Sequence, residues 1–375
     1  MLNRALLMKQ MQQVSSTLFV DIGPELSIAY ESWQRIIKDP FFVHKIRQIS
    51  TGWLVPDWYE SLNTIIPVSP DLSFYCVASV DGSQVYPDRH QGTSCFLVNI
   101  GSVQLHYGPM CIAPVLFDSQ PLIYTDYAQS EVAWGPELVN CLRQELELEN
   151  GLSLSKNFMS QNPDVPFAFL FDGSFIFWHL ESKDTNLKDI FLKKYLSLLD
   201  QLYQSRILCA GYISLPKSKE LVNLIRIELC KFKIEGCKEL EAVSHLVDTS
   251  IARFFLPPNT RSIVFKSNAQ IGQLYPDHLK PHFFYCNVGT EIVRIEIPAW
   301  IAADSVLLEQ LSQIILNQVV KGRGYPVALA EAHEQAVVKG PDREFFYHLI
   351  TKLSIEKKQH LSMSQKSIKK RGIGI

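Results

Sequence analysis

The stretch LSFYCVASVDG, residues 72–82, is rich in β-branched and aromatic residues and stops at an Asp-Gly pair, which is typical of a strand. A second stretch, FAFLFDGS at residues 167–174, repeats the arrangement: an unbroken apolar run leads into Asp-Gly-Ser. Both runs are too continuous for strands with one face in water, so they predict strands buried on both faces. Each run ends at one acid, Asp81 in the first and Asp172 in the second.

Two interpretations of these Asp-Gly pairs remain open from the motifs alone. Between apolar runs, Asp-Gly is a strong hairpin signal, because Gly readily adopts the positive φ that tight turns require. Each pair can therefore be a structural turn. Alternatively, Asp81 and Asp172 are functional acids that the fold brings together. The order of the other elements favours the second interpretation.

The rest of the chain is patterned as helices before residue 71 and as mixed strands and helices after it. We predict strands at 94–108, broken at Gly101; a helix from Pro136 to Asn150; a polar loop at 153–166; a strand at 167–181; a helix at 187–205; a strand at 207–216; a helix at 219–232; a β-rich segment at 262–298; and helices at 307–322, 325–339 and 342–353.

These segments predict an α/β fold in which helices flank a mixed β-sheet, with N-terminal helices and a β-rich insertion. No repeat of fixed period and no Gly-Ser linker divides the chain. We therefore expect an N-terminal helical segment at 1–70, one main domain at 71–350 and a basic C-terminal tail at 351–375.

The order of elements matches the ribonuclease H-like fold, in which carboxylates on the first and fourth strands converge and helices supply further site residues. Asp81 and Asp172 take the strand positions, and His333 lies on a late helix. Carboxylates so close together repel one another unless a cation neutralises them. Two divalent ions can clamp a phosphoryl group and activate water, and hard cations such as Mn²⁺ or Mg²⁺ prefer oxygen ligands. The pattern thus predicts metal-dependent phosphodiester hydrolysis.

The third acid and the remaining candidates are less defined by the pattern. Glu145, Glu147 and Glu149 lie on one predicted helix, about 200° apart from one to the next, so periodicity leaves the choice open. His333 has small neighbours that allow its helix to pack closely, although a lone His is also commonly a structural hydrogen-bonding residue. Tyr212, at the end of the strand AGYIS, can equally be a core aromatic residue.

Composition limits the class of protein. No window contains 18 consecutive apolar residues, and polar residues interrupt the N-terminal segment, so we expect neither a membrane span nor a signal peptide. The eight cysteines contain no Cys-x-x-Cys pair, which argues against a zinc site or a disulfide framework and suits reduced thiols in the cytoplasm. His278 and His282 have the spacing of metal ligands on a helix, but Pro281 favours a loop there.

The net charge of −2 does not suggest nucleic-acid binding, but the distribution of basic residues does. Between Lys352 and Arg371 the sequence has seven basic residues and a single acid, Glu356. Such a segment can lie along phosphates and add salt-dependent affinity, or it can be a solvated end. The basic residues are Lys352, Lys357, Lys358, Lys366, Lys369, Lys370 and Arg371.

Several stretches resemble the NurA nucleases, especially their longer bacterial form, over about residues 72–350. The resemblance implies a ribonuclease H-like core, Mn²⁺-dependent single-strand endonuclease and 5′–3′ exonuclease activity, and a ring-like homodimer. It also implies a partner, the hexameric HerA ATPase that translocates DNA, in end resection for double-strand-break repair. The matching stretches are SVDGSQVYPDRH, FLFDGSFIFWHLE, AGYISLPKSKELVNLIR, EIVRIEIPAW and KGRGYPVALAEAHEQAVV.

The resemblance also implies roles for single residues. Asp81 and Asp172 match the two metal-binding aspartates of the family. The family's glutamate follows an Arg by four residues, as Glu147 follows Arg143, so Glu147 is the implied ligand and Glu145 the alternative. The long segment between Glu147 and Asp172 departs from shorter members and keeps both open. The family's Tyr and late His are matched by Tyr212 and His333.

Two other functions compete with a nuclease. A DNA-binding adaptor that had lost catalysis would be expected to lack one of the acids, and here all are present. A phosphatase acting on small molecules would share the carboxylate chemistry but would have no use for a basic tail. A serine nucleophile is not supported, because neither Ser83 nor Ser174 lies in a G-x-S-x-G elbow.

Overall fold

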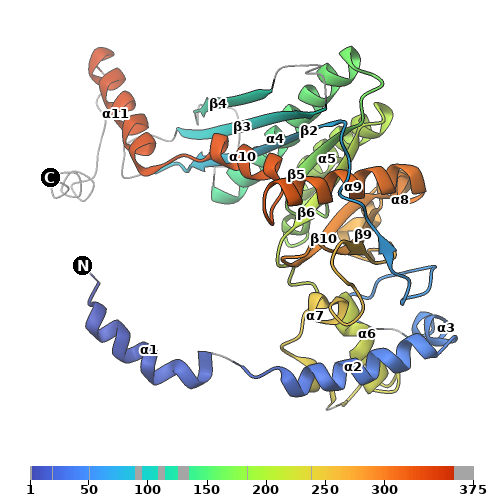
Figure 1. The fold of residues 1–375 in the computed structure, drawn as a ribbon. Coiled ribbons are helices and arrows are strands. Elements are labelled where there is room, and N and C mark those ends of the chain that lie inside the picture. Colours follow the sequence, from blue (N-terminus) through green and yellow to red (C-terminus); the bar gives the residue numbers. More distant parts are fainter. Residues whose placement is uncertain are drawn as a thin grey trace.

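A single sheet passes through the molecule (Figure 1). The computed structural model describes residues 2–18, 20–49, 51–88, 95–108, 115–125, 135–183, 185–237 and 239–358. Within these residues ten strands form one sheet in the order β1-β7-β9-β10-β6-β5-β2-β3-β4, and β8 pairs with β9. The strands are β1 Ile66–Pro67, β2 Tyr75–Val85, β3 Phe96–Tyr107, β4 Leu116–Tyr124, β5 Phe167–Asp172, β6 Leu208–Ile213, β7 Thr260–Arg261, β8 Phe265–Lys266, β9 Pro281–Asn287 and β10 Ile292–Pro298.

The helices flank this sheet, as the sequence predicted. The α-helices are α1 Arg4–Leu18, α2 Gly23–Lys38, α3 Phe42–Arg47, α4 Pro136–Gln161, α5 Thr185–Gln204, α6 Glu220–Leu229, α7 Asp248–Ala252, α8 Ala299–Ala302, α9 Ser305–Lys321, α10 Val327–Ala336 and α11 Gly340–Glu356. Short 3₁₀ helices lie at Trp178–Leu180, Glu239–Val243, Ile271–Leu274 and Asp277–Leu279. The predicted fold class, a mixed sheet with flanking helices, is confirmed, and the β-rich segment at 262–298 extends the same sheet.

The strands that carry the two aspartates are neighbours. β2 and β5 pair in parallel, with Ser79 opposite Leu170, and β5 pairs in parallel with β6, with Asp172 opposite Tyr212. β3 runs antiparallel to β2 and places Gly101 opposite Asp81. Because β2 and β5 are adjacent and point the same way, Asp81 and Asp172 emerge at the same end of the sheet.

The first Asp-Gly pair is not a turn. β2 continues through Asp81 and Gly82 to Val85, so the hairpin interpretation of this pair is wrong. The second pair does end a strand: β5 stops at Asp172, and Gly173 has a φ of +130°. The strand predicted over 167–181 is therefore shorter, and a 3₁₀ turn follows it.

Helix α4 is longer than the sequence predicted, because it includes most of the expected polar loop at 153–166. Its buried residues Leu152, Ser155 and Phe158 continue the helical spacing of three and four beyond Asn150. Gly151 allows the helix to approach the sheet, since a Cβ there would lie 1.8 Å from the ring of Phe169. The other polar residues of this part of the helix are exposed, namely Ser153, Lys156, Asn157, Ser160 and Gln161.

Helices α4 and α10 cover opposite faces of the sheet beside the aspartates. A Cβ on Gly82 of β2 would meet Arg143 and Glu147 of α4. A Cβ on Gly101 of β3 would meet the backbone of α10. Since the side chains of Asp81 and Gly101 share one face and that of Gly82 the other, the end of β2 lies between two helices.

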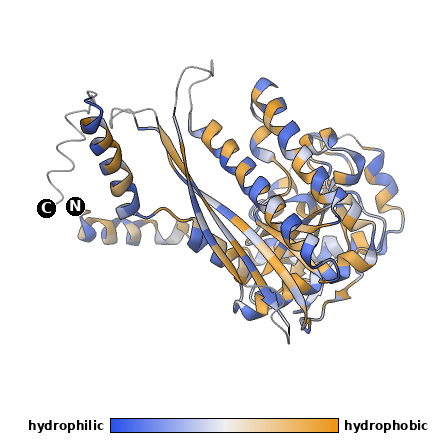
Figure 2. Ribbon diagram, turned by 90° about the horizontal axis from the view of Figure 1, so that it is seen from above, coloured by the Kyte–Doolittle hydropathy of each residue, from blue (hydrophilic) through white to orange (hydrophobic). Residues whose placement is uncertain are grey.

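The N-terminal helices contribute to a second core, away from the helices that cover β2 and β5. Helix α2 buries Ala29, Trp33 and Ile36 against α6 and α7, and the ring of Trp33 stacks on that of Phe255 at 5.4 Å. Helix α1 stands apart from the main body, whereas α11 packs Phe346 and Tyr347 against Val85 and Leu97; both helices also carry exposed hydrophobic residues (Figure 2). Among the described residues, no helix combines the length and the apolar character needed to cross a membrane.

Two sequence-based expectations need correction or qualification here. Cys230 and Cys237 form a disulfide, whereas we expected reduced thiols. Positive φ at Lys231 and Phe232 turns the chain back after α6 and brings the Cα atoms of the two cysteines within 5.8 Å.

Helix α11 reaches Glu356, so the beginning of the predicted tail is helical. Four basic residues of that tail lie outside the described residues, namely Lys366, Lys369, Lys370 and Arg371.

Candidate active site

A pocket of about 660 Å³ opens where β5 ends beside β2. Both strand aspartates line it, together with residues from α4 and from the 3₁₀ turn after β5. The lining combines acidic, basic, amide and aromatic side chains. The acids are Asp81, Glu137, Glu147 and Asp172; the basic residues are Arg143, His179 and Lys183; the amides are Gln84, Asn140 and Gln144; and the aromatic residues are Tyr86, Phe171, Phe175, Phe177 and Trp178.

Glu147 is the helix acid that faces this pocket. Its Oε1 accepts a hydrogen bond of 2.8 Å from Nη1 of Arg143, which also donates to the carbonyl of Gly82 at 2.9 Å. Glu145 points elsewhere, and its carboxylate pairs with Lys194 of α5 at 2.7 Å. The arginine spacing that favoured Glu147 therefore corresponds to a real contact, with Arg143 and Glu147 one helical turn apart.

The absence of a side chain at Gly82 creates the space for this contact. A Cβ there would lie 2.7 Å from Cγ of Arg143 and 2.7 Å from Oε1 of Glu147. The same Arg143 Nη1 lies 3.9 Å from Oδ1 of Asp81. Arg143 therefore stands between two of the three carboxylates and offsets part of their charge.

The electrostatics of the pocket disfavour further negative charge. Burial raises the pKa of Glu147 to about 8; Arg143 acts against the rise, while Asp81 and Asp172 add to it. Burial also raises the pKa of Asp172, which a hydrogen bond from Tyr325 lowers and the charge of Asp81 raises. Acids that perturb one another in this way share one enclosed region of the pocket. A cation placed among them would relieve the repulsion.

His333 reaches the same acids from α10. Its Nδ1 lies 2.8 Å from Oδ2 of Asp81, and 58% of its side chain is exposed. The helix packs closely because Ala332 and Ala336 are buried, and a Cβ on Gly101 would lie 2.3 Å from the backbone nitrogen of Ala336. Small residues were predicted to allow this approach. The imidazole itself is not a buried structural group.

The structure brings a different tyrosine to the site from the one that the sequence indicated. Tyr325 donates a hydrogen bond to Asp172 and lies just before α10. Tyr212 is fully buried on β6, its hydroxyl has no hydrogen-bond partner within the described part of the chain, and its ring packs edge-on against Tyr325 at 5.4 Å. The ring of Tyr212 therefore packs against Tyr325 and does not itself reach the acids. The signal for Tyr325 was its position next to the helix that carries His333.

The three acids fit a divalent cation in their donor chemistry and charge. All supply carboxylate oxygens to one pocket, and such ligands suit Mn²⁺ and Mg²⁺. As arranged, no three His, Cys, Asp or Glu side chains among the described residues already form a metal-binding group, and Arg143 occupies part of the carboxylates' hydrogen-bonding capacity. His278 and His282 do not meet: His278 pairs with Asp200, and His282 bonds to the backbone of Lys280.

Comparisons with known proteins matched one family model to most of the chain. The model of the NurA domain matches residues 76–338. Among solved structures, a NurA with manganese has 12% identity over 92% of this chain and 98% of that chain, with a TM-score of 0.40. A NurA bound to dAMP and manganese has 14% identity over 88% and 94%, with a TM-score of 0.36. None of the curated proteins matches the chain.

Proposed function

The chain belongs to the NurA family, and from this premise we propose that it is a divalent-metal-dependent DNA nuclease. The observation that carries the proposal is the meeting of Asp81, Glu147 and Asp172 in one pocket. These acids come from two adjacent parallel strands and a helix, and Tyr325 and His333 contact two of them. A purely structural role would not account for so many acids gathered in one pocket.

The proposed chemistry is hydrolysis of a phosphodiester bond. Asp81, Glu147 and Asp172 would hold Mn²⁺ or Mg²⁺, which when bound neutralises phosphate charge and lowers the pKa of a water molecule. Asp81 accepts a hydrogen bond from Nδ1 of His333, which leaves Nε2 of the exposed imidazole to orient water or transfer a proton. Tyr325 fixes Asp172 by donating a hydrogen bond from its hydroxyl to the carboxylate.

The aromatic residues of the pocket support a nucleic-acid substrate. Trp178 is 36% exposed and lines the pocket beside Phe171 and Tyr86. Nucleobases of single strands stack on such rings without sequence preference. We propose single-stranded DNA as the substrate, with endonuclease and 5′–3′ exonuclease activity. The family further supports a homodimer that acts with a HerA-type hexameric ATPase in end resection and double-strand-break repair.

A cleavage assay on the full chain tests the proposal. A labelled single-stranded oligonucleotide is incubated with Mn²⁺, and a chromogenic phosphate ester is tested in parallel. We expect cleavage of DNA by the natural protein and none by Asp172→Asn. Binding of DNA without cleavage would point to an adaptor, and hydrolysis of only the ester to a phosphatase.

A further inference from the structure

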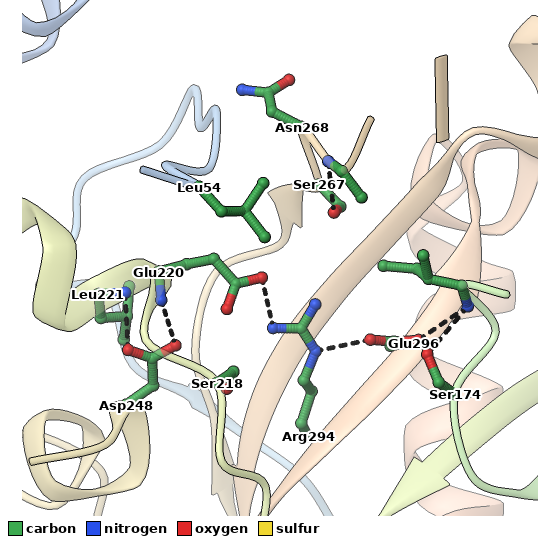
Figure 3. Close-up of polar contacts among 12 residues, drawn as sticks. Leu54, Ser174, Ser218, Glu220, Leu221, Asp248, Ser267, Asn268, Arg294 and Glu296 are labelled. Atoms are coloured by element: carbon green, nitrogen blue, oxygen red, sulfur yellow. Dashed lines mark hydrogen bonds and ion pairs between the residues drawn. The ribbon is translucent and has the colours of Figure 1, made fainter. Parts of the chain in front are cut away.

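A buried cluster of charges joins β10 to the segment that follows Asp172 (Figure 3). Arg294 of β10 donates from Nε to Oε1 of Glu296 at 2.7 Å and from Nη1 to Oε1 of Glu220 at 2.8 Å. The side chains of Arg294, Glu220 and Glu296 are 3%, 3% and 1% exposed. None of the three faces the pocket that holds Asp81, Glu147 and Asp172.

The other oxygen of Glu296 holds the segment that follows Asp172. Its Oε2 accepts three hydrogen bonds: from Oγ of Ser174 at 2.7 Å, from the backbone nitrogen of Phe175 at 2.8 Å, and from that of Ile176 at 3.2 Å. With Arg294 on Oε1, one carboxylate thus engages four donors. A carboxylate accepts on both oxygens, so Glu296 can satisfy all four donors at once.

The segment is also fixed on its other side, where it leaves β5. Gly173 adopts a φ of +130° and donates from its nitrogen to the carbonyl of Tyr212 at 3.0 Å. The carbonyl of Gly173 lies so near β6 that a Cβ on Gly211 would be 2.5 Å from it. Glu296 lies opposite Gly211 in the sheet. Asp172 therefore ends a strand whose continuation is held by β6 and by Glu296.

The cluster is anchored at its far end as well. Glu220 begins α6, and the carboxylate of Asp248 accepts hydrogen bonds from the backbone nitrogens of Glu220, Leu221 and Val222 at 2.8–2.9 Å. The hydroxyl of Tyr285 donates a hydrogen bond of 2.7 Å to the same carboxylate. The guanidinium of Arg294 lies 3.7 Å from the ring centre of Phe283. The contacts of Asp248 therefore fix Glu220 at one end of the cluster, as those of Glu296 fix residues 174–176 at the other.

Stability alone does not explain such a cluster. Burying charges costs free energy, and apolar residues of similar volume often stabilise a fold at least as well as a buried ion pair. What the cluster provides is directional restraint on residues 174–176. We propose that Glu296 is a positioning residue, which sets the carboxylate of Asp172 for cation binding through the segment that follows it. This inference rests on the proposed function.

The test measures Mn²⁺ binding to the full chain without DNA, by the electron paramagnetic resonance signal of free Mn²⁺. In Glu296→Gln the amide can accept on one side only, and its NH₂ group faces a donor on the other. We expect the Kd for Mn²⁺ to rise about 10–100-fold, as for other residues that orient metal ligands. On DNA, kcat should fall while KM changes little.

A matched control separates positioning from general destabilisation. Leu105→Ala removes a buried side chain of β3, remote from this cluster, and lowers the melting temperature without touching it. It should leave the Kd for Mn²⁺ unchanged. Ser174→Ala, which deletes one of the three bonds to Glu296, should raise the Kd by a smaller factor and serves if Glu296→Gln does not fold.

The outcomes are distinct. Unchanged Mn²⁺ affinity in Glu296→Gln, or in Ser174→Ala where the first variant does not fold, overturns the positioning role. The positioning role is also overturned if Leu105→Ala weakens Mn²⁺ binding as much as the Glu296 variant does at an equal loss of melting temperature. A natural protein that neither binds Mn²⁺ nor cleaves DNA overturns the proposed function instead.

Discussion

The pocket brings together the carboxyl groups of Asp81, Glu147 and Asp172, and the single guanidinium of Arg143 can neutralise only part of their negative charge. Arg143 contacts Glu147 and approaches Asp81, and among the described residues no ion pair joins it to Asp172. The pKa of Glu147 is raised to about 8, because burial disfavours the charged form of its carboxyl. Glu145, the alternative acid on α4, pairs with Lys194 and does not line this pocket, so single substitutions can separate the roles of the two glutamates.

Glu147→Gln should lose nearly all nuclease activity, while Glu145→Gln should keep most of it. The first removes an oxygen ligand from the pocket, and the second only breaks the contact of Glu145 with Lys194, whose side chain is 49% exposed. Initial rates on a single-stranded oligonucleotide with Mn²⁺ measure both. The reverse ranking would move the metal site to the other side of α4.

The metal-free protein should become less stable as the pH rises from about 5 to about 8. The pKa of Glu147 is raised from its ordinary 4.5 to about 8, so between these values the folded chain binds more protons than the unfolded chain. Stability then falls with rising pH in that window. Urea unfolding in the presence of a chelator measures the free energy of unfolding at both ends, and Glu147→Gln should flatten the slope. Equal slopes in the two proteins would count against the raised pKa.

His333→Ala should reduce turnover by about 10²–10⁴-fold, the usual contribution of general acid–base catalysis. Because 58% of the side chain is exposed, the melting temperature should change little. His333→Asn keeps a hydrogen-bonding group but cannot titrate, so it should restore little turnover if His333 transfers a proton. Single-turnover rates and melting curves on the two variants decide it. A destabilised but active Ala variant would remove His333 from the site.

Sequence patterns singled out acids that the structure brings into one pocket, but not the tyrosine that reaches them. Asp81 and Asp172 were visible because an acid after a long apolar run is unusual, whereas periodicity left the glutamate open and only the family resemblance, with its Arg four residues earlier, favoured Glu147. Tyr212 and Tyr325 both precede a change of element, and no pattern shows which hydroxyl reaches the acids. The choice depends on β6 being buried on both faces, which is a property of the assembled sheet.

At the scale of elements, the close contact of α10 with the sheet determines where His333 lies. Asn99 donates from Nδ2 to the carbonyl of Ala336 at 2.8 Å and so satisfies a free group at the end of the helix. Ser83 donates to the same carbonyl. The helix is held at its C-terminal end by two strands, and Gly101 allows it to touch them.

Gly101→Ala should therefore displace α10 and impair catalysis. The new Cβ would lie 2.3 Å from the backbone nitrogen of Ala336. Because this neighbour is a backbone atom, the helix or the strand must move to make room. A cost of about 1–3 kcal/mol in the free energy of unfolding is typical of overpacking. A shift of about 1 Å at His333 can lower turnover about 10²-fold. Gly340→Ala, where the added Cβ meets nothing within 4 Å, is the control. Full activity in Gly101→Ala would show that the position of α10 is unimportant.

Element boundaries were the part that the sequence predicted least well. Asp81-Gly82 has the composition of a turn, yet pairing with β3 continues past it, because Gly82 gives room to Arg143 and Glu147. The polar residues after Asn150 suggested a loop, yet the apolar spacing of α4 continues to Phe158. In both cases tertiary contacts outweighed local preference.

For the molecule as a whole, one sheet joins both cores, and the charge is unevenly distributed along the chain. The net charge is −2, while basic residues gather beyond α11. The fold class was predictable, since alternating strand and helix patterns allow few arrangements. The joining of the β-rich segment at 262–298 to the same sheet was not, because strand order is set by contacts between distant parts of the chain.

Removal of the residues after Lys358 should weaken DNA binding at low salt and reduce its salt dependence. The deleted segment contains Lys366, Lys369, Lys370 and Arg371, and each phosphate contact on single-stranded DNA contributes about 0.7 to the slope of log affinity against log salt. Turnover on saturating DNA should persist. Fluorescence anisotropy across a salt series measures the slope, and an unchanged slope would mean that the segment is only a solvated end.

The placement of α10 late in the chain has a consequence during protein synthesis. Asp81, Glu147 and Asp172 have all left the ribosome before Tyr325 and His333 are made. A nascent or prematurely terminated chain that stops before residue 325 can present the three acids but never the hydroxyl or the imidazole that contacts them. Such a product lacks the contacts that Tyr325 and His333 make with Asp172 and Asp81, so the proposed active site is completed only once α10 has been made.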